Sequence, residues 1–257
     1  MIPAEVTTPP SSRRDGRAES RAESRTDSGT KSPAESHRPW GPVAARVVVG
    51  YAVISAVLIG AGLLIDRTLT DTALAEWDRS TVRWFADHRT TTLDTMSKMW
   101  SRLADAPSIV AFGLLIAIVL GVRRHWFLVV TTGAILAVEL LTFLTISYTV
   151  GRERPDVVHL GSVPSTGSFP SGHIAATIVL YGFLAYLLHR FRAPAPLVIL
   201  AVVWTVVAAA AVGWARMYRG MHHPLDVIAG ALMGLAVLVT FVAAITPASH
   251  PKQEELA

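Results

Sequence analysis

Six apolar stretches dominate the pattern of hydrophobic and polar positions, each 15 to 25 residues long and bounded by polar residues. A helix needs about 20 mostly apolar residues to cross the hydrocarbon core of a bilayer. We therefore expect an all-α polytopic membrane protein with a bundle of six transmembrane helices, in which the two shortest stretches borrow flanking residues. The predicted spans are Val43–Ile65, Ala106–Val122, Trp126–Val150, Ile174–Leu188, Pro196–Trp214 and Leu225–Ile245.

The segment between the first two spans, Asp66–Asp105, mixes apolar and charged residues. Its apolar positions, among them Trp77, Trp84 and Trp100, recur at intervals typical of one face of a helix. This spacing predicts amphipathic helices that lie on the membrane surface or cap the bundle. The alternative is that these helices simply pack against the spans.

Residues 1–42 differ in composition from the rest of the chain. They are rich in Ser, Arg, Glu and Pro and carry the sequence Arg-Ala-Glu-Ser twice, from Arg17 and from Arg21. A segment with so few apolar side chains is expected to be a disordered, solvated tail, and a regulatory or lipid-surface role is the alternative. The expected organisation is this tail, one membrane domain over residues 43–245, and a short C-terminal tail over residues 246–257.

The orientation of the spans is predicted from the two short loops that carry arginine pairs. Arg123 and Arg124 separate the second and third spans, and Arg190 and Arg192 separate the fourth and fifth. Short loops rich in Lys and Arg face the cytoplasm. With six spans, both termini then lie in the cytoplasm, and the loops after the third and fifth spans lie on the extracytoplasmic side of the cell membrane.

Composition supports a membrane protein and narrows its chemistry. Hydrophobic residues make up 51% of the 257 residues, and charged residues only 16%, which is too apolar for an ordinary soluble domain. The chain has no cysteine, which excludes disulfides and thiolate chemistry. The net charge of +4 is small, and its distribution along the chain matters more than its value. We expect the lipid bilayer as a partner and no nucleic acid; the oligomeric state stays open.

Three short motifs stand at the predicted extracytoplasmic ends of the spans. They are Arg152-Glu153-Arg154-Pro155, then Pro170-Ser171-Gly172-His173, then Arg216 with His222 and Asp226. Guanidinium groups match phosphate oxygens in pairs, and two histidines can supply a nucleophile and an acid. The motifs therefore predict chemistry on a phosphate ester.

The order of these motifs, with five residues between Arg216 and His222 and three between His222 and Asp226, resembles the type 2 phosphatidic acid phosphatase (PAP2) family. This family of membrane lipid phosphatases is related to the soluble vanadium-dependent haloperoxidases. The resemblance covers about residues 71–245. It implies a PAP2/haloperoxidase-like helical core, a metal-independent phosphatase without a cofactor, and a phosphorylated lipid as substrate.

The resemblance also assigns roles to individual residues. His222 would attack phosphorus and form a phosphohistidine, Asp226 would fix the His222 tautomer, and His173 would act as general acid and then base. Phosphate would be held by Arg154 and Arg216, and by Ser171 and Gly172 at a helix N-terminus. Metal ligation by His173, His222 and Asp226 is a poor alternative, because the two guanidiniums would repel the ion.

The chain departs from the family pattern at Ser147, where the family has a lysine seven residues before the arginine that corresponds to Arg154. Arg152 is our preferred substitute for this missing phosphate cation, and Arg219 is the alternative. If neither compensates, the protein is slow, prefers another substrate, or is a catalytically silent PAP2-like protein that binds phosphate lipids or partners.

Glu139 lies in the middle of the third predicted span, where an ionisable group is costly and is a functional candidate. It precedes Arg154 by 15 residues, or about 22 Å along a helix, so we expect it to be too far away to touch the phosphate. Its possible roles are a structural residue inside the bundle or part of a proton or substrate path.

These observations together predict a membrane lipid phosphatase with an extracytoplasmic site. The family resemblance implies undecaprenyl pyrophosphate, phosphatidic acid or phosphatidylglycerol phosphate as substrates, and the sequence does not choose between them. A haloperoxidase is disfavoured by the six apolar spans, and a transporter built around Glu139 is disfavoured because no internal inverted repeat is visible.

Overall fold

The computed structural model describes residues 40–246, which form eight α-helices and no β-strand. The predicted tails lie outside these residues, except for positions 40–42 at the start of the first helix and residue 246 at the end of the last. The helices are α1 (Trp40–Arg67), α2 (Ala73–Asp87), α3 (Thr91–Leu103), α4 (Ala106–Val122), α5 (Trp126–Val150), α6 (Gly172–Arg190), α7 (Ala195–Tyr218) and α8 (Pro224–Ile245).

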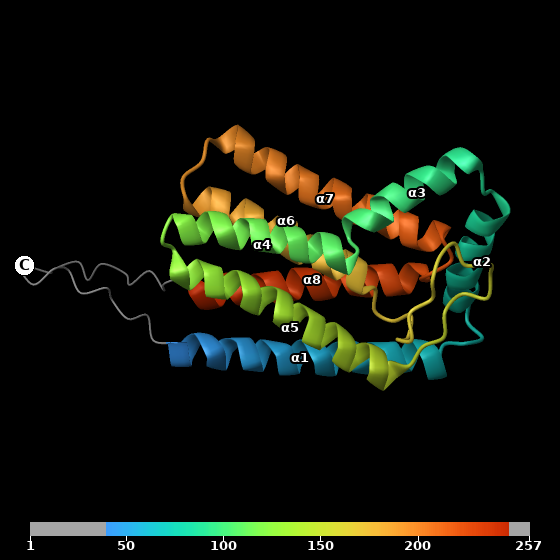
Figure 1. Ribbon diagram of the computed structural model, residues 1–257. Helices are drawn as coiled ribbons and strands as arrows, with labels where there is room; N and C mark the ends of the chain where they lie inside the picture. The colour runs from blue at the N-terminus through green and yellow to red at the C-terminus, as the bar shows by residue number, and fades with distance from the viewer. Residues whose placement is uncertain (1–39, 247–257) are drawn as a thin grey trace, which may run out of the picture. The chain divides into compact units, whose positions relative to one another are not determined.

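Six of these helices correspond to the six predicted spans and run side by side along the bundle (Figure 1). Five of them, α1, α5, α6, α7 and α8, are long and apolar enough to cross a membrane on their own. With 17 residues, α4 qualifies only together with α3, to which it is joined at an angle of 45°. The predicted polytopic all-α fold is confirmed.

Helix α6 is the central element of the bundle, because it packs against α4, α5, α7 and α8. Its apolar side chains point in several directions and most of them are buried, among them Val179 and Phe183. They meet buried side chains of α5 and α8, such as Ile135 and Phe241, in one hydrophobic cluster. The N-terminus of α6 is therefore held rigidly where its first turn reaches the end of the bundle.

Two glycines bring the backbone of α8 close to the start of α6. A Cβ atom at Gly230 would lie 2.3 Å from the carbonyl oxygen of Ser171, and one at Gly234 would lie 2.8 Å from Cα of Ala175. Small residues four positions apart on one face let helices in a membrane approach closely. The crossing sets the first turn of α6 directly beside the first turns of α8.

The segment between the first two spans forms α2 and α3, which confirms that it is helical. Helix α2 stands at the end of the bundle and contacts α7 and α8, and α3 packs along α7 (Figure 1). Asp78 of α2 is completely buried. Helix α2 thus packs against the spans through Ala75, Asp78 and Val82, whereas Trp77 and Trp84 are exposed.

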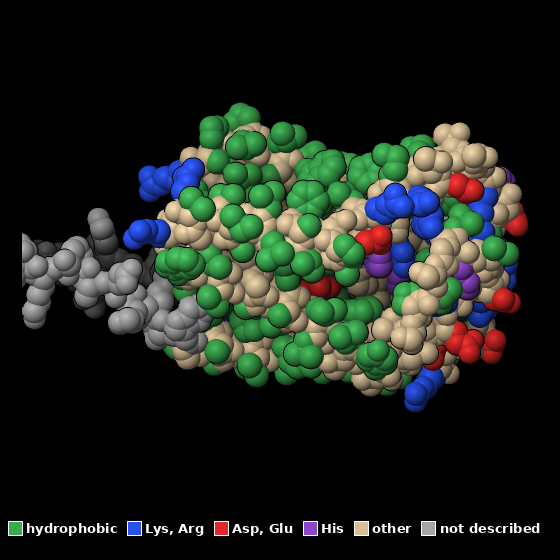
Figure 2. All heavy atoms as spheres, viewed as in Figure 1, with side chains coloured by type: hydrophobic (Ala, Val, Ile, Leu, Met, Phe, Trp, Pro, Cys, Tyr) green, Lys and Arg blue, Asp and Glu red, His purple; other side chains and the backbone are tan. Residues whose placement is uncertain are grey.

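The surface of the bundle has an apolar side and two polar ends (Figure 2). Lys and Arg side chains gather at the end where α4 meets α5 and α6 meets α7, and Arg123, Arg124, Arg190 and Arg192 are exposed there. Charges of both signs lie at the other end, near α2 and the loop over residues 151–171. All three sequence motifs lie at this second end.

Candidate active site

His222 lies in the turn between α7 and α8 and is almost fully buried. Its Nδ1 is 2.7 Å from the backbone carbonyl oxygen of Ser168. A carbonyl oxygen only accepts hydrogen bonds, so Nδ1 carries the proton and Nε2 keeps a free lone pair. This is the tautomer that an attacking imidazole requires.

Asp226 has other partners than the one that the sequence predicted. Its Oδ2 lies 3.9 Å from His222 Nδ1, beyond hydrogen-bond distance. Asp226 instead accepts the backbone N–H of His223 at 2.8 Å, as part of the capping box that opens α8, and Nη1 of Arg152 at 2.5 Å. The predicted control of the His222 tautomer by Asp226 is corrected, because the carbonyl of Ser168 fulfils that role.

Arg152 is likewise not directed at a phosphate. Besides Asp226, it binds the buried Asp78 of α2 at 2.6 Å, and Asp78 also accepts the backbone N–H of Leu225 at 2.8 Å. Two carboxylates thus occupy both terminal nitrogens of this guanidinium. The predicted phosphate contact of Arg152 is corrected to a structural one that ties α2 to the start of α8.

His173, the second residue of α6, pairs with a carboxylate that the motifs did not include. Its Nε2 lies 3.1 Å from Oδ1 of Asp105. Asp105 is the N-cap residue of α4, at the break where the chain bends after α3. A carboxylate on one ring nitrogen orients the imidazole, stabilises its protonated form, and leaves Nδ1 as the nitrogen for proton transfer.

Arg154 and Arg216 approach the same space from two elements. Arg154 donates to the carbonyl oxygens of Met221 at 2.7 Å and of Thr166 and Gly167 at 3.2 Å. Arg216, in the last turn of α7, donates from Nη1 to the hydroxyl of Ser101 at 3.1 Å. The Nε atoms of both arginines are buried and have no hydrogen-bond acceptor among the described residues. Buried donors without acceptors are rare, and an anion would satisfy them.

Ser171 and Gly172 open α6, as the motif predicted. Ser171 occupies the N-cap position, yet its hydroxyl caps no backbone N–H and is another buried polar atom without a partner in the described chain. The first N–H groups of a helix have no acceptor within the helix and favour anions. This helix end therefore offers additional hydrogen-bond donors beside His173.

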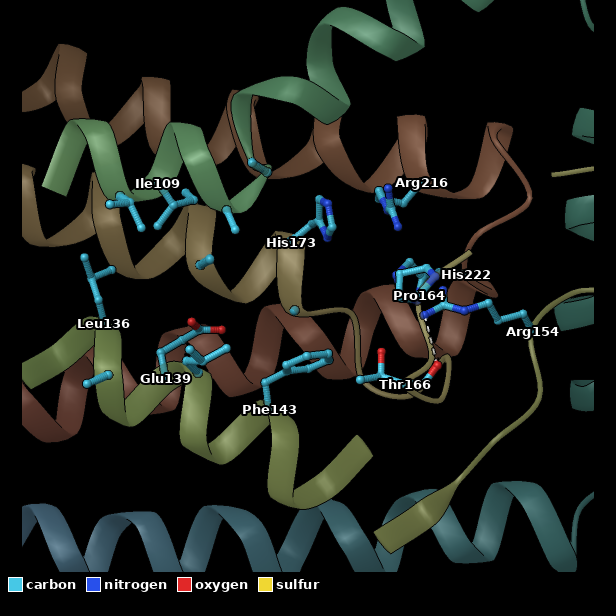
Figure 3. A pocket seen from close by; sticks show the side chains of 17 residues that line it. Ile109, Leu136, Glu139, Phe143, Arg154, Pro164, Thr166, His173, Arg216 and His222 are labelled. Atoms are coloured by element: carbon cyan, nitrogen blue, oxygen red, sulfur yellow. Dashed lines mark hydrogen bonds between the residues drawn. The ribbon is translucent and has the colours of Figure 1, made fainter. Parts of the chain in front are cut away.

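These residues meet at one cavity of about 410 Å³ (Figure 3). His173, His222, Arg154 and Arg216 line its polar end, together with Gly172 and the loop residues Pro164 and Thr166; Ser171, Arg152 and Asp226 are not part of its lining. Apart from Glu139, the remainder of the wall is apolar and comes from Ala104 and from α4, α5 and α6. The polar end of the cavity suits a charged group, and the apolar wall suits an apolar chain attached to that group.

Glu139 lines this cavity as well, so it shares one pocket with Arg154 although 15 residues separate the two along the chain. Whether it touches a bound phosphate stays a prediction. In the structure, α5 ends at Val150, and Arg154 follows in the loop after it. The side chain of Arg154 folds back over the end of the bundle and donates to the carbonyl oxygen of Met221. Figure 3 shows Glu139 directed from α5 toward the same cavity as the two histidines.

The electrostatic surroundings keep His222 uncharged. Burial lowers the pKa of His222 well below its ordinary value of 6.5, and the positive charge of Arg216 acts in the same direction. The negative charge of Asp226 opposes this shift without cancelling it. A neutral imidazole at neutral pH is what nucleophilic attack requires.

The comparison with known proteins agrees with this arrangement. A model of the PAP2 superfamily matches residues 124–249. Residues 124–249 of this protein thus belong to the PAP2 superfamily. The matched range contains the three motifs of the cavity and starts shortly before α5.

Two curated relatives of this PAP2 protein are bacterial. The chain is 33% identical over 129 residues to "Putative undecaprenyl-diphosphatase YbjG" of Escherichia coli (strain K12), a match that covers 47% of this chain and 60% of the relative. It is 27% identical over 165 residues to the bacitracin transport permease protein BcrC of Bacillus licheniformis, covering 58% of this chain and 75% of that protein.

Two solved structures share the fold. One is the crystal structure of a transmembrane PAP2-type phosphatidylglycerolphosphate phosphatase from Bacillus subtilis, with a TM-score of 0.59 and 21% identity, covering 79% of this chain and 95% of the other. The other is LpxE of Aquifex aeolicus, with a TM-score of 0.50 and 21% identity, covering 68% of this chain and 97% of the other. The helical arrangement described above is thus that of PAP2 membrane proteins.

The position of the PAP2 lysine is occupied by Ser147, which is buried in the last turns of α5. Its hydroxyl donates to the carbonyl oxygen of Gly167 at 3.2 Å, the same oxygen that accepts from Arg154. Arg219, the second candidate substitute, donates to the carbonyl of Leu160. Neither Arg152 nor Arg219 lines the cavity, so Arg154 and Arg216 are the cations at its polar end.

Three residues that hold the site in place lie outside the sequence motifs: Asp105, Asp78 and Ser168. Asp105 carried one usable signal, since an Asp before Ala106-Pro107 is typical of a helix N-cap, but nothing indicated that it meets His173. Asp78 stands among exposed charges of α2 and has no distinguishing pattern. Ser168 acts through its backbone carbonyl, which leaves no trace in the sequence.

Proposed function

We propose that this protein is an integral-membrane, metal-independent lipid phosphatase that hydrolyses a phosphomonoester or pyrophosphate through a phosphohistidine on His222. One observation carries the proposal. A single cavity brings together two histidines and two arginines at its polar end, and both arginines have a buried Nε without an acceptor in the described chain. Its long apolar wall suits the hydrocarbon part of a lipid.

In the first half-reaction, Nε2 of His222 attacks phosphorus and the bond between phosphorus and the lipid oxygen breaks. The leaving oxygen takes a proton from His173, which is worth about 10² to 10⁴ in rate. Arg154 and Arg216 stabilise the charge on the equatorial phosphate oxygens. The carboxylate of Asp226, 3.9 Å from the ring of His222, favours the cationic phosphohistidine.

In the second half-reaction, His173 accepts a proton from a water molecule while the water oxygen attacks phosphorus. The bond between phosphorus and Nε2 then breaks, inorganic phosphate leaves, and His222 regains its free lone pair. Asp105 is a positioning residue in both steps, because it orients His173 and balances the charge of its protonated ring.

The proposed substrates carry the headgroup at the extracytoplasmic surface of the cell membrane. The arginine-bearing loops at the opposite end of the bundle support this orientation, and the name of the relative from Escherichia coli, an undecaprenyl-diphosphatase, supports undecaprenyl pyrophosphate as a candidate. Phosphatidic acid and phosphatidylglycerol phosphate, which fit the same polar end and apolar wall, are the other candidates.

The test is release of inorganic phosphate by the purified full-length protein in detergent with EDTA present, from undecaprenyl pyrophosphate and from phosphatidic acid. We expect release by the native protein and none above background by H222A, since the nucleophile is gone. H189A is the matched control, because His189 lies in the last turn of α6 and does not line the cavity, and it should retain most of the activity.

Release that persists in H222A would exclude the phosphohistidine, and release that EDTA abolishes would exclude metal independence. If the native protein releases no phosphate from either lipid while it binds both, it is a catalytically silent PAP2-like protein that binds phosphate lipids. Ser147 in place of the family lysine motivates this alternative.

A further inference from the structure

The proposed reaction leaves one polar group of the cavity without a role, the carboxyl group of Glu139. This residue lies in the middle of α5 and is 5% exposed. No hydrogen bond or ion pair joins its side chain to another residue within 40–246, although it lines the cavity. An ionisable side chain at this depth is costly unless something satisfies it.

The depth of Glu139 below the proposed phosphate site follows from the position of Phe143, which lies on the same face of α5. Phe143 packs against the start of α6, since a Cβ at Gly172 would lie 3.0 Å from its ring, and Gly172 adjoins His173. Glu139 precedes Phe143 by four residues, which is about 6 Å along the helix axis. The carboxyl group therefore faces the cavity about one helical turn deeper than the histidine.

The walls around Glu139 are otherwise apolar. Ile109 of α4 and Leu136 and Leu140 of α5 line the same part of the cavity, and Figure 3 shows Ile109 and Leu136 near the deep end. A ligand that reaches this depth with hydrocarbon alone would leave the carboxyl group unsatisfied. A ligand with a polar group at this depth would satisfy it.

We propose that Glu139 forms a second subsite that hydrogen-bonds the ester linkage of an acyl-bearing lipid phosphate. The inference rests on the proposed phosphatase function and adds a determinant of the lipid part of the substrate. In a diacylglycerol phosphate, the ester carbonyls follow the phosphate within a few bonds, at about the depth of one helical turn. In a polyprenyl phosphate, only hydrocarbon occupies this depth.

The hydrogen bond requires a donor on the protein side, because an ester carbonyl only accepts. A carboxyl group among apolar walls is far less costly as the neutral acid than as the anion, and the neutral acid has an O–H to donate. Glutamine at this position would donate through its amide N–H. Leucine fills a similar volume and donates nothing.

The experiment compares three substrates: a dioleoyl phosphatidic acid, its dialkyl ether analogue, and undecaprenyl pyrophosphate. The ether analogue keeps the phosphate and the chains and lacks only the carbonyls. We expect the native protein to prefer the diacyl lipid over the ether lipid by about five- to tenfold in kcat/KM, the value of one neutral hydrogen bond. This comparison needs no variant.

The variants locate that preference in one residue. E139L should abolish the preference, so that the ratio of kcat/KM on the diacyl lipid to kcat/KM on the ether lipid falls to about one. E139Q should retain the preference. T142V is the matched control, since it removes a buried hydroxyl from α5 that bonds only its own helix at Val138 and does not line the cavity.

Equal rates of the native protein on diacyl and ether lipids would overturn the subsite, as would an E139L variant that slows all three substrates alike. The second result would indicate a structural or proton-transfer role for Glu139. These outcomes differ from failure of the phosphatase proposal itself, in which the native protein releases phosphate from none of the three lipids.

Discussion

Two imidazole rings face the cavity, and an oxygen atom of the protein holds one nitrogen of each. The carbonyl of Ser168 accepts from His222, and the carboxylate of Asp105 pairs with His173. A neutral carbonyl selects a tautomer without favouring the charged ring, whereas a carboxylate also stabilises the cation. The carbonyl suits a neutral nucleophile, and the carboxylate of Asp105 offsets part of the cost of a proton on His173, which burial and the charges of Arg216 and Arg154 oppose.

The first prediction concerns the acidic limb of the pH profile. A histidine whose pKa is lowered stays neutral as the pH falls, until the pH reaches the lowered value. Because burial and Arg216 lower the pKa of His222, kcat/KM should remain high through pH 6.5 and decline only in more acidic solution. Initial rates of phosphate release between pH 4 and 9 measure this, and a decline centred above pH 6.5 would contradict a buried, neutral His222.

A second prediction at this scale concerns the partner of the general acid. D105N keeps the size of the side chain but removes the charge that stabilises protonated His173, so kcat should fall by about tenfold or more. In the H173A background, the same change should have little further effect, because the two residues act as one unit. Independent, additive losses in the double variant would show that Asp105 acts elsewhere.

At the scale of helices, the site depends on how closely α8 approaches α6. G230A would place a methyl group 2.3 Å from the carbonyl of Ser171 and push the first turn of α6 away from His222. We expect a loss of about 1 to 3 kcal/mol in stability and of most of the activity. G60A is the control, since nothing lies within 4 Å of its new methyl group. Thermal unfolding in detergent and phosphate release provide the two readouts.

The helices were the part of the structure that the sequence predicted best. The bounds of α4 and α5 match the predicted spans because the short turn with Arg123 and Arg124 separates the two helices and hydropathy falls at their other ends. Contacts between elements could not be predicted in this way. The pairing of Arg152 with Asp78 joins residues 74 positions apart, and local patterns carry no information about such pairs. That Glu139 lines the same cavity as Arg154 could not be predicted for the same reason.

The two ends of the molecule differ, which gives it a defined direction across the membrane. Exposed arginines of the short loops mark one end, and the cavity opens near the other (Figures 1 and 2). Because the native chain has no cysteine, single cysteines report the orientation directly. In intact cells, a membrane-impermeant maleimide should label S162C in the long loop, and it should label A195C at the start of α7 only after permeabilisation. The reverse pattern would place the site in the cytoplasm.

The PAP2 family match begins at residue 124, yet three residues before that boundary bind side chains of the three motifs. Asp78 binds Arg152, Ser101 accepts from Arg216, and Asp105 pairs with His173. Exchanging residues 124–249 between relatives would therefore separate a reactive half from the half that holds it in place. Damage to residues 78–105 should show up as a catalytic defect even though the three motifs are intact, and compensating changes are expected to arise in pairs across this boundary.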